Sequence, residues 1–355
     1  MKWLIPGISS ILASLSLISL RSIAPDLVGK QLLFFVIGFV VFYVISFINS
    51  TTLKKTALIA YWFLNIILLG LLLVGTTTRG ITGWINLFEG FKIQPSQFAV
   101  FITSWFVITQ LPSLKLDSWV GFLKLIGIIA IPGLLIFLEP DFGTSLVYFV
   151  SLGSILFFLS IKFKYLFSLG AILAISLAAM WLFMFQPYQK LRITSFVGSN
   201  SNQENSATYN AQQALIAVGS GQLYGRGLGF GVQSHLKFLP ERQTDFIFAS
   251  IAEEWGFFGS LILISLYFVL IVILFAQALS MRNIEIQIFI LVVAVMLFVQ
   301  VSVNIGMNLG LLPITGITLP LVSYGGSSIL SFLLSLGVVF GQTQIKKNNF
   351  KTRIH

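Results

Sequence analysis

The sequence predicts an all-α polytopic membrane protein with about ten transmembrane helices, because apolar runs of about 20 residues recur along the chain. Of the 355 residues, 57% are hydrophobic and only 9% are charged, and the mean hydropathy is +0.96. A soluble domain carries about a quarter of its residues as charged side chains, so a water-soluble fold is excluded. The apolar residues form continuous runs rather than alternating with polar ones, which argues against a transmembrane β-barrel.

Ten apolar segments are expected to cross the membrane in sequence order. The first is too long for the apolar core of a signal peptide and lacks a small-residue cleavage site, so we expect it to remain as a helix. The fourth is short and begins with a proline in its first turn, which suits a helix start. No repeat or soluble domain is evident, so residues 1–355 are expected to form a single transmembrane domain. The segments are 4–20, 31–48, 56–74, 97–110, 120–138, 143–161, 165–185, 247–279, 285–304 and 327–343.

Two connections between these helices stand out. Residues 186–245 form the longest polar stretch and predict a long outer loop between the seventh and eighth helices. Residues 304–328 are apolar but are interrupted by five glycines and two prolines. Irregular backbone at membrane depth is tolerated only where protein buries it or where it lines a cavity. A re-entrant segment before the tenth helix is therefore expected.

The formal net charge of +10 reflects membrane orientation rather than nucleic-acid binding, because the cations lie in short loops between apolar runs. With the N-terminus inside, the inner segments hold 12 of the 21 Lys and Arg residues, and the short outer loops hold 4. The other five lie in the long loop, which the positive-inside rule discounts. Both termini are therefore expected in the cytoplasm. Nine of the 11 acidic residues then lie toward the outside, where we expect the chemistry.

Six glycines lie between residues 219 and 231, after an apolar segment, Ala211 to Val218, that we expect to dip into the interface as a half-helix. Glycine lets a backbone approach a ligand closely. No strand precedes the run, so it is not a dinucleotide-binding fingerprint. Two interpretations remain open: a flexible outer turn, or a cradle in which backbone amides and Arg226 hold a diphosphate.

Asp245 lies at the start of the eighth predicted helix. A carboxylate in a first turn is favoured by the helix dipole, so simple capping is one interpretation. If the helix continues from Asp245, the small residues Ala249, Ala252 and Gly256 lie within about 40° of its face and leave a groove with room for a substrate. Glu253 lies about 12 Å deeper, where an acid costs about 2.5–3.5 kcal/mol. It is expected to face a polar cavity or to pair with a cation, for structure or for function.

Glu139-Pro140-Asp141 joins the fifth and sixth predicted helices through a very short outer loop. Proline at a first helical position with flanking acids is ordinary N-terminal chemistry. The alternative is a second carboxylate site, near Asp245, that binds a divalent cation.

Four groups of motifs follow one another along nearly the whole chain. In combination they are highly specific, and they resemble the SEDS family of peptidoglycan glycosyltransferases, which includes RodA, FtsW and SpoVE. Val232-Gln233-Ser234 and Glu241-Arg242 are more similar to the elongation member RodA than to the division member FtsW. The motifs are GWINL (83–87) with Gln94-Pro95-Ser96, EPDFGT (139–144), PERQTDFIF (240–248) with AEEWG (252–256), and LLPITGITLPLVSYGGSS (311–328).

The resemblance implies an activity, a cofactor and partners. Such enzymes join lipid II units outside the bacterial cytoplasmic membrane and release undecaprenyl diphosphate. The configuration at the anomeric carbon is inverted, and the product is a β-1,4-linked glycan. The implied cofactor is a divalent cation, Mg²⁺ or Mn²⁺, and the implied partners are the growing glycan strand and a class B penicillin-binding protein. The critical aspartate of the family falls on Asp245, as general base or as a metal ligand with Asp141. Its important tryptophan falls on Trp84.

The expected site has a catalytic base and a set of substrate-binding residues. Glycosyl transfer from a lipid diphosphate needs a base, which Asp245 supplies, and charge stabilisation on the leaving group. Guanidinium and ammonium groups on the outer side suit phosphate oxygens, and apolar grooves between helices are expected to hold the lipid tail. The expected substrate-binding residues are Trp84, Arg79, Lys92, Arg226, Arg242, Gln94, Ser96, Glu139, Asp141 and Glu253.

Four positions depart from the family pattern. Gly83 replaces an arginine, Gln97 a glutamate, Val100 a lysine and Gln243 a histidine. Gln97 and Val100 are interpreted as the joint loss of a salt bridge, or alternatively as a sign of weakened catalysis.

Other functions remain as alternatives. A lipid II flippase also fits ten helices and a broken ninth-to-tenth connection, but the acids cluster at the outer mouth, which favours an enzyme. A division polymerase of the FtsW kind and an inactive scaffold for a transpeptidase are the remaining hypotheses.

Overall fold

The computed structural model describes residues 3–78, 81–88, 91–159, 161–171, 206–236 and 238–351. Seven of the described helices are long and apolar enough to cross a membrane. They are α1 (Leu4–Ile23), α2 (Val28–Ser46), α3 (Ser50–Val74), α5 (Trp119–Leu138), α11 (Ile247–Ser280), α12 (Ile284–Asn308) and α13 (Gly326–Lys351). The chain is thus a mostly helical protein with several membrane spans, as the apolar runs predict.

Two shorter apolar helices also belong to the described part of the bundle. α4 (Ala99–Gln110) is entered through the 3₁₀ turn η2 (Pro95–Phe98), where a proline occupies the first position as expected. α6 (Phe142–Phe158) is 17 residues long. The predicted span 165–185 lies outside the described residues beyond 171, as does most of the predicted loop 186–245. Short 3₁₀ turns also occur at η1 (Pro25–Leu27) and η3 (Leu111–Ser113).

The expectation of an all-α chain is wrong between α3 and α4. There β1 (Thr76–Thr78), β2 (Ile81–Phe88) and β3 (Phe91–Ile93) form an antiparallel sheet in the order β1-β2-β3. β2 carries Ile, Thr, Trp and Phe, and such β-branched and aromatic residues favour extended backbone. β2 is only 8 residues long, so the search for apolar runs of about 20 residues did not predict it.

Glycines allow α13 to approach α2 closely. A β-carbon on Gly337 would lie 2.6 Å from the carbonyl oxygen of Phe42, and one on Gly341 would lie 2.3 Å from that of Ser46. Small residues four apart on one helix face let two backbones pack directly in a membrane bundle. α12 lies deeper still: residues 288–294 are all buried, so this stretch is covered on every face.

The segment 309–325, between α12 and α13, has irregular backbone, and residues 319–323 of it are buried in the bundle. Leu319, Leu321 and Val322 are each at most 1% exposed. The carbonyl groups of this segment accept hydrogen bonds from side chains of four helices, which satisfies the need to pair buried backbone polar groups. These bonds are Ser16 Oγ to Val322 O (2.7 Å), Gln31 Nε2 to Ser323 O (3.0 Å), Tyr267 OH to Pro320 O (2.6 Å) and Asn304 Nδ2 to Ile317 O (2.7 Å).

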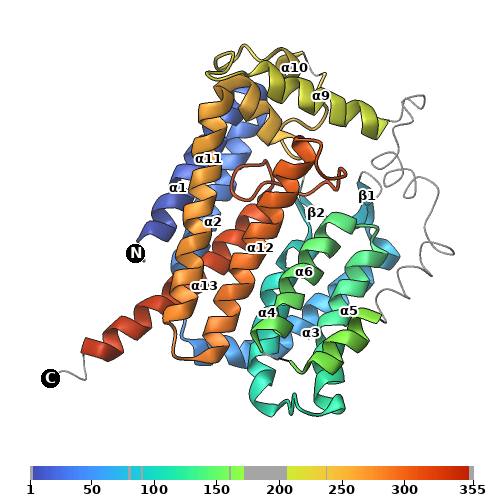
Figure 1. Cartoon of the computed structure of the whole chain (residues 1–355), viewed down its shortest axis with the longest axis vertical. Helices are drawn as coiled ribbons and strands as arrows, with labels where there is room; N and C mark the ends of the chain where they lie inside the picture. The colour runs from blue at the N-terminus through green and yellow to red at the C-terminus, as the bar shows by residue number, and fades with distance from the viewer. Residues whose placement is uncertain are drawn as a thin grey trace.

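Two further helices, α9 (Ser206–Ser220) and α10 (Val232–His235), lie with β1 and β2 at one end of the bundle (Figure 1). The irregular segment before α13 lies just beneath them, and both chain ends lie away from that end (Figure 1). The polar elements that surround Asp245 are thus gathered at one end of the helices.

Candidate functional site

Asp245 lies in the short segment that leads into α11, and hydrogen bonds from two other elements, α12 and the loop before α13, fix this segment. Gln243 O accepts from the backbone N–H of Tyr324 (2.8 Å), and Thr244 O accepts from Ser323 Oγ (2.5 Å). The carbonyl of Asp245 itself accepts from the side-chain amides of two α12 residues, as the bonds from Asn304 and Asn308 are 3.0 Å each. The Asp245 side chain is half-buried. Its backbone is therefore held firmly while its carboxylate remains partly accessible.

Residues 315–317, in the loop before α13, lie between Asp245 and the start of α6. Gly316 has φ +75°, and a β-carbon there would lie 3.7 Å from Oδ2 of Asp245. A β-carbon on Gly143 would lie 2.6 Å from the carbonyl oxygen of Thr315. Residues 315–317 thus contact both the Asp245 carboxylate and the first turn of α6, which follows Asp141 directly. Glycine permits the close approach at 143 and the positive φ at 316.

Asp141 caps α6 and joins a buried polar cluster. Its Oδ1 accepts from the backbone N–H of Thr144 (2.9 Å), as expected for a helix cap. Its Oδ2 accepts a 2.6 Å hydrogen bond from Nε2 of Gln94. Asp141 is 5% exposed, and burial raises the pKa of its carboxyl, against the lowering effect of the bonds from Thr144 and Gln94. Asp141 therefore caps α6 at the helix end that contacts residues 315–317.

The Gln-Pro-Ser motif holds this cluster against α13. The backbone N–H of Gln94 donates to Ser327 Oγ (2.9 Å), and Gln94 and Ser96 are 5% and 1% exposed. The Gln97 amide donates to Gln94 Oε1 and to Thr144 Oγ1, each at 3.3 Å. Val100 is 4% exposed. A neutral amide at 97 is thus hydrogen-bonded and an apolar side chain at 100 is buried, and both interpretations of these two departures stay predictions.

Glu139 is fully buried beside this cluster. Neither of its carboxylate oxygens has a hydrogen-bond partner among the described residues. Burial, and then the neighbouring Asp141 carboxylate, raise the pKa of Glu139 to about 8. Its backbone carbonyl accepts from the N–H of Thr82 (3.4 Å), which brings β2, and with it the half-buried Trp84, next to the α5–α6 connection.

The predicted groove of small residues under Asp245 is absent, because α9 fills it. α11 begins at Ile247, and Gly256 interrupts it with φ 69° and ψ −163°. Ala249 packs in a buried cluster with Ala214 and Ala217 of α9. The segment 211–218 is helical as predicted, but its alanine face packs on α11.

The glycines between residues 219 and 231 allow this segment to pack closely on α11. A β-carbon on Gly221 would lie 1.9 Å from Ala252 O, and one on Gly225 would lie 2.1 Å from Glu254 O. The amides of Arg226 and Gly227 donate to the carbonyls of Glu253 and Glu254, each at 3.0 Å. These amides are therefore already paired and do not form an anion cradle. The Arg226 side chain itself is exposed and donates to Ser220 O (3.3 Å).

Glu253 and Glu254 attach the glycine run and α10 to α11. Glu253 is fully buried and accepts from the amides of Gln233 (2.8 Å) and Ser234 (3.0 Å) and from Ser234 Oγ (2.7 Å). Glu254 contacts Ser22 Oγ (2.5 Å) and His235 Nε2 (3.1 Å). The carboxylates of Glu253 and Glu254 thus accept their hydrogen bonds from other parts of the protein, which indicates a structural role.

The predicted site residues thus fall into separate groups. Asp245, Asp141, Gln94 and Ser96 gather around the loops before α6 and α13, with Glu139 and Trp84 alongside. Arg242 turns its guanidinium toward the end of α1, where Nε and Nη2 donate to Ile23 O at 3.1 and 3.0 Å. Lys92 is exposed on β3, and Arg79 lies outside the described residues.

The two asparagines that donate hydrogen bonds to the carbonyl of Asp245 were not predicted from the sequence. Asn304 and Asn308 are both fully buried in α12. The available signal was two amides four residues apart in an otherwise apolar helix, because polar residues inside a span are costly and usually face a partner.

A divalent cation suits the carboxylates that are present. Mg²⁺ commonly takes one or two carboxylates together with water and substrate phosphates. Asp141 and Asp245, on either side of residues 315–317, offer such a pair. Within the described part of the chain, no group of three or more His, Asp or Glu residues is placed so that it could hold a metal ion.

Comparisons with known proteins agree with this architecture. The family model for FtsW, RodA and SpoVE, described as "cell cycle protein", matches residues 7–348. The "probable peptidoglycan glycosyltransferase FtsW" of Wigglesworthia glossinidia brevipalpis is 33% identical over 338 residues, 92% of this chain and 84% of that protein. The "peptidoglycan glycosyltransferase MrdB" of Escherichia coli K12 is 34% identical over 308 residues, covering 85% of this chain and 81% of its own.

A solved structure extends the similarity to three dimensions. A chain from a work on "structural coordination of polymerization and crosslinking by a peptidoglycan synthase complex" has a TM-score of 0.82 and 27% identity, over 97% of this chain and 98% of that one. The match covers essentially the whole fold. This chain belongs to the FtsW/RodA/SpoVE family, the SEDS peptidoglycan glycosyltransferases.

Proposed function

We propose that this protein polymerises lipid II into β-1,4-linked glycan strands on the outer face of the bacterial cytoplasmic membrane, with inversion and with undecaprenyl diphosphate as leaving group. The observation that carries the proposal is the position of Asp245: its backbone is fixed by α12 and the loop before α13, and its half-buried carboxylate faces that loop. A general base must be held within hydrogen-bond reach of the proton that it removes.

The residues of this chain have distinct roles in the proposed reaction. Asp245 takes the proton of the acceptor sugar hydroxyl. Gln94 orients the Asp141 carboxylate through its 2.6 Å hydrogen bond. A divalent cation held by Asp141 and Asp245 would offset the charge that grows on the departing diphosphate. Trp84 on β2 lies at the edge of this region.

The decisive experiment is glycan formation from labelled lipid II by the purified protein. We expect polymer from the wild type and none from Asp245→Asn, with unchanged thermal unfolding because the backbone bonds to α12 remain. A flippase or an inactive scaffold makes no polymer, so an inactive wild type sinks the proposal. An active Asp245→Asn variant removes Asp245 from the role of base.

We further propose that both termini are cytoplasmic. The charge distribution supports this orientation, and the absence of cysteine provides a direct test. A single cysteine replacing Tyr224, which is 81% exposed, is expected to react with a membrane-impermeant maleimide in intact spheroplasts. A cysteine replacing the exposed Ser113 is expected to react only after lysis. The opposite pattern would invert the topology.

An elongation role and a transpeptidase partner complete the proposal. Val232-Gln233-Ser234 and Glu241-Arg242 resemble the elongation branch of the family, and the solved relative comes from a complex described as coordinating polymerisation with crosslinking. We expect depletion to give rounded cells, whereas filaments would indicate the division role. Co-purification with a class B penicillin-binding protein tests the partner.

A further inference from the structure

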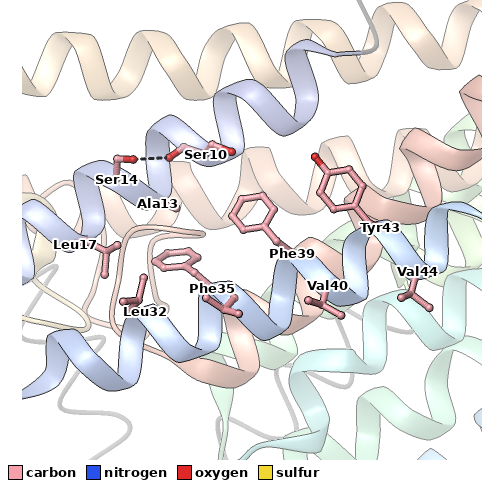
Figure 2. Close-up of a pocket in the computed structure, with 11 residues that line it drawn as sticks. Ser10, Ala13, Ser14, Leu17, Leu32, Phe35, Phe39, Val40, Tyr43 and Val44 are labelled. Carbon is pink, nitrogen blue, oxygen red and sulfur yellow. Dashed lines mark hydrogen bonds between the residues drawn. The ribbon is translucent and has the colours of Figure 1, made fainter.

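An open, apolar groove of about 620 Å³ runs between α1 and α2 on the surface of the bundle. Phe35, Phe39 and Tyr43 of α2 turn toward α1, and the small residues Ser10 and Ser14 lie across from them (Figure 2). Large side chains on one helix opposite small ones on the other leave a channel between the two.

The groove presents hydrocarbon despite its two serines. Ser10 Oγ donates to Pro6 O (2.8 Å) and Ser14 Oγ donates to Ser10 O (3.0 Å), so both hydroxyl hydrogens are used within α1. Val36 and Val40 on the α2 side are 55% and 57% exposed. The groove is thus open sideways, toward the lipid that surrounds a membrane protein, and a chain-like molecule can enter from the bilayer.

The length of the groove exceeds one lipid leaflet. The α2 residues that line it run from Leu32 to Val44, about 18 Å at 1.5 Å per residue. One leaflet of a hydrocarbon core of about 30 Å supplies about 15 Å. An extended hydrocarbon chain that fills the groove is therefore longer than one leaflet is deep.

One end of the groove carries a cation. Arg21 follows Leu17 by four residues, which puts it on the same face of α1, and it is exposed. A guanidinium group there suits a phosphate at the end of an apolar tail.

The same end connects to the candidate site through a short series of hydrogen bonds. Gln31, beside Leu32 in the sequence, donates to Ser323 O (3.0 Å), and Ser323 donates to the carbonyl of Thr244 (2.5 Å), the residue before Asp245. Arg242 makes a second connection through Ile23 O, two residues beyond Arg21.

We propose that the α1–α2 groove binds the polyprenyl tail of the lipid-linked substrate, with Arg21 facing its phosphate end. The inference rests on the proposed polymerase function and adds a place for the tail. Hydrocarbon lining, a cation near one end and continuity with the segment that carries Asp245 favour a phosphate-ended hydrocarbon chain over a partner helix. Competition by phosphatidylglycerol distinguishes a polyprenyl chain from an ordinary phospholipid.

Filling the groove tests the proposal. Ser10→Phe with Ser14→Phe places two rings in the channel at exposed positions, and Ile11→Phe with Ile18→Phe is the matched control on another face of α1. With full-length lipid II we expect the filled variant to raise KM about tenfold or more, at little cost to kcat. A lipid II analogue whose tail is shortened to a few isoprene units is expected to react equally well with both variants.

The outcomes separate the two proposals. An inactive wild type overturns the polymerase function. An active wild type with an unchanged KM for full-length lipid II in the filled variant overturns the groove assignment alone. A KM that rises equally for both tail lengths also overturns it, because a tail site must distinguish them.

Photolabelling gives a readout that does not depend on turnover. A polyprenyl phosphate with a diazirine in its tail is expected to label peptides from α1 and α2. Excess undecaprenyl phosphate should prevent the labelling, and phosphatidylglycerol should not. Labelling confined to other helices, or equal competition by phosphatidylglycerol, overturns the proposal.

Discussion

Asn304 donates hydrogen bonds from its side-chain amide to the backbone carbonyls of Asp245 (3.0 Å) and Ile317 (2.7 Å). One amide thus joins the segment that carries the proposed base to the irregular loop that faces it. Asn308, one turn further along α12, donates to Asp245 O and accepts from the N–H of Ala249 (3.0 Å). α12 therefore sets the position of Asp245 relative to the loop before α13.

Replacing Asn304 by leucine should lower polymerisation more than it lowers stability. The change removes the side-chain donor of Ile317 O and leaves Asp245 O with that of Asn308 alone, and one unsatisfied buried carbonyl costs about 1–3 kcal/mol. Asn65→Leu in α3 is the control, because Asn65 is also buried and also donates to a backbone carbonyl, that of Tyr61 (2.8 Å). Thermal unfolding and kcat are measured for both. Equal losses of kcat in the two variants would contradict a positioning role for Asn304.

Replacing Gln94 by leucine should raise the Mg²⁺ or Mn²⁺ concentration required for half-maximal activity. The variant loses the 2.6 Å bond that orients Asp141, and a ligand that is not held in place binds a metal less tightly. A shift of about tenfold is expected. Gln110→Leu, at the other end of α4 and far along the helix from this cluster, serves as the control. An unchanged metal dependence in Gln94→Leu would remove Asp141 from the proposed metal site.

The helices were predictable because each apolar run exceeds the length that a bilayer needs. β2 was not, since Ile81–Phe88 is too short and too mixed to stand out beside 20-residue runs. Asp245 was singled out as a candidate because an acid at a span boundary is unusual in an apolar chain. The packing of Ala249 against α9 could not be predicted, because a row of small residues indicates a groove as readily as a tight helix contact. Only the arrangement in space decides between them.

Replacing Glu253 by glutamine should weaken the attachment of residues 225–236 to α11 without unfolding the helical bundle. The carboxylate accepts three hydrogen bonds from Gln233 and Ser234, and an amide would direct N–H groups at backbone donors. Bonds to a charged group contribute about 1.5–3 kcal/mol each. Limited proteolysis should therefore cut residues 225–236 faster. Glu285→Gln, which removes the ion pair with Lys54 at the start of α12, should leave this cleavage unchanged. If both variants are cut alike, Glu253 is not the anchor of α10.

Replacing Glu139 by glutamine should flatten the dependence of stability on pH. The pKa of Glu139 is raised to about 8 in the folded protein, above its ordinary value of 4.5, chiefly by burial. Between these values the folded state binds a proton that the unfolded state has lost, so the free energy of unfolding falls as pH rises through this window. Each pKa unit corresponds to about 1.4 kcal/mol. Glutamine keeps the shape of the protonated side chain and has no proton to lose.

The measurement is thermal unfolding in detergent at pH 5.5 and pH 8.5. The melting temperature of the wild type should be lower at pH 8.5 than at pH 5.5. The melting temperature of Glu139→Gln should fall less over this range, so that the variant is the more stable protein at pH 8.5. Asp117→Asn is the control, because Asp117 is exposed, pairs with Lys162 (2.7 Å), and has a pKa lowered by that lysine. Its contribution is lost only as pH falls below the ordinary range of an aspartate, so the variant should follow the wild type between pH 5.5 and 8.5. An equal slope in wild type and Glu139→Gln would mean that the buried Glu139 carboxyl does not titrate in this window.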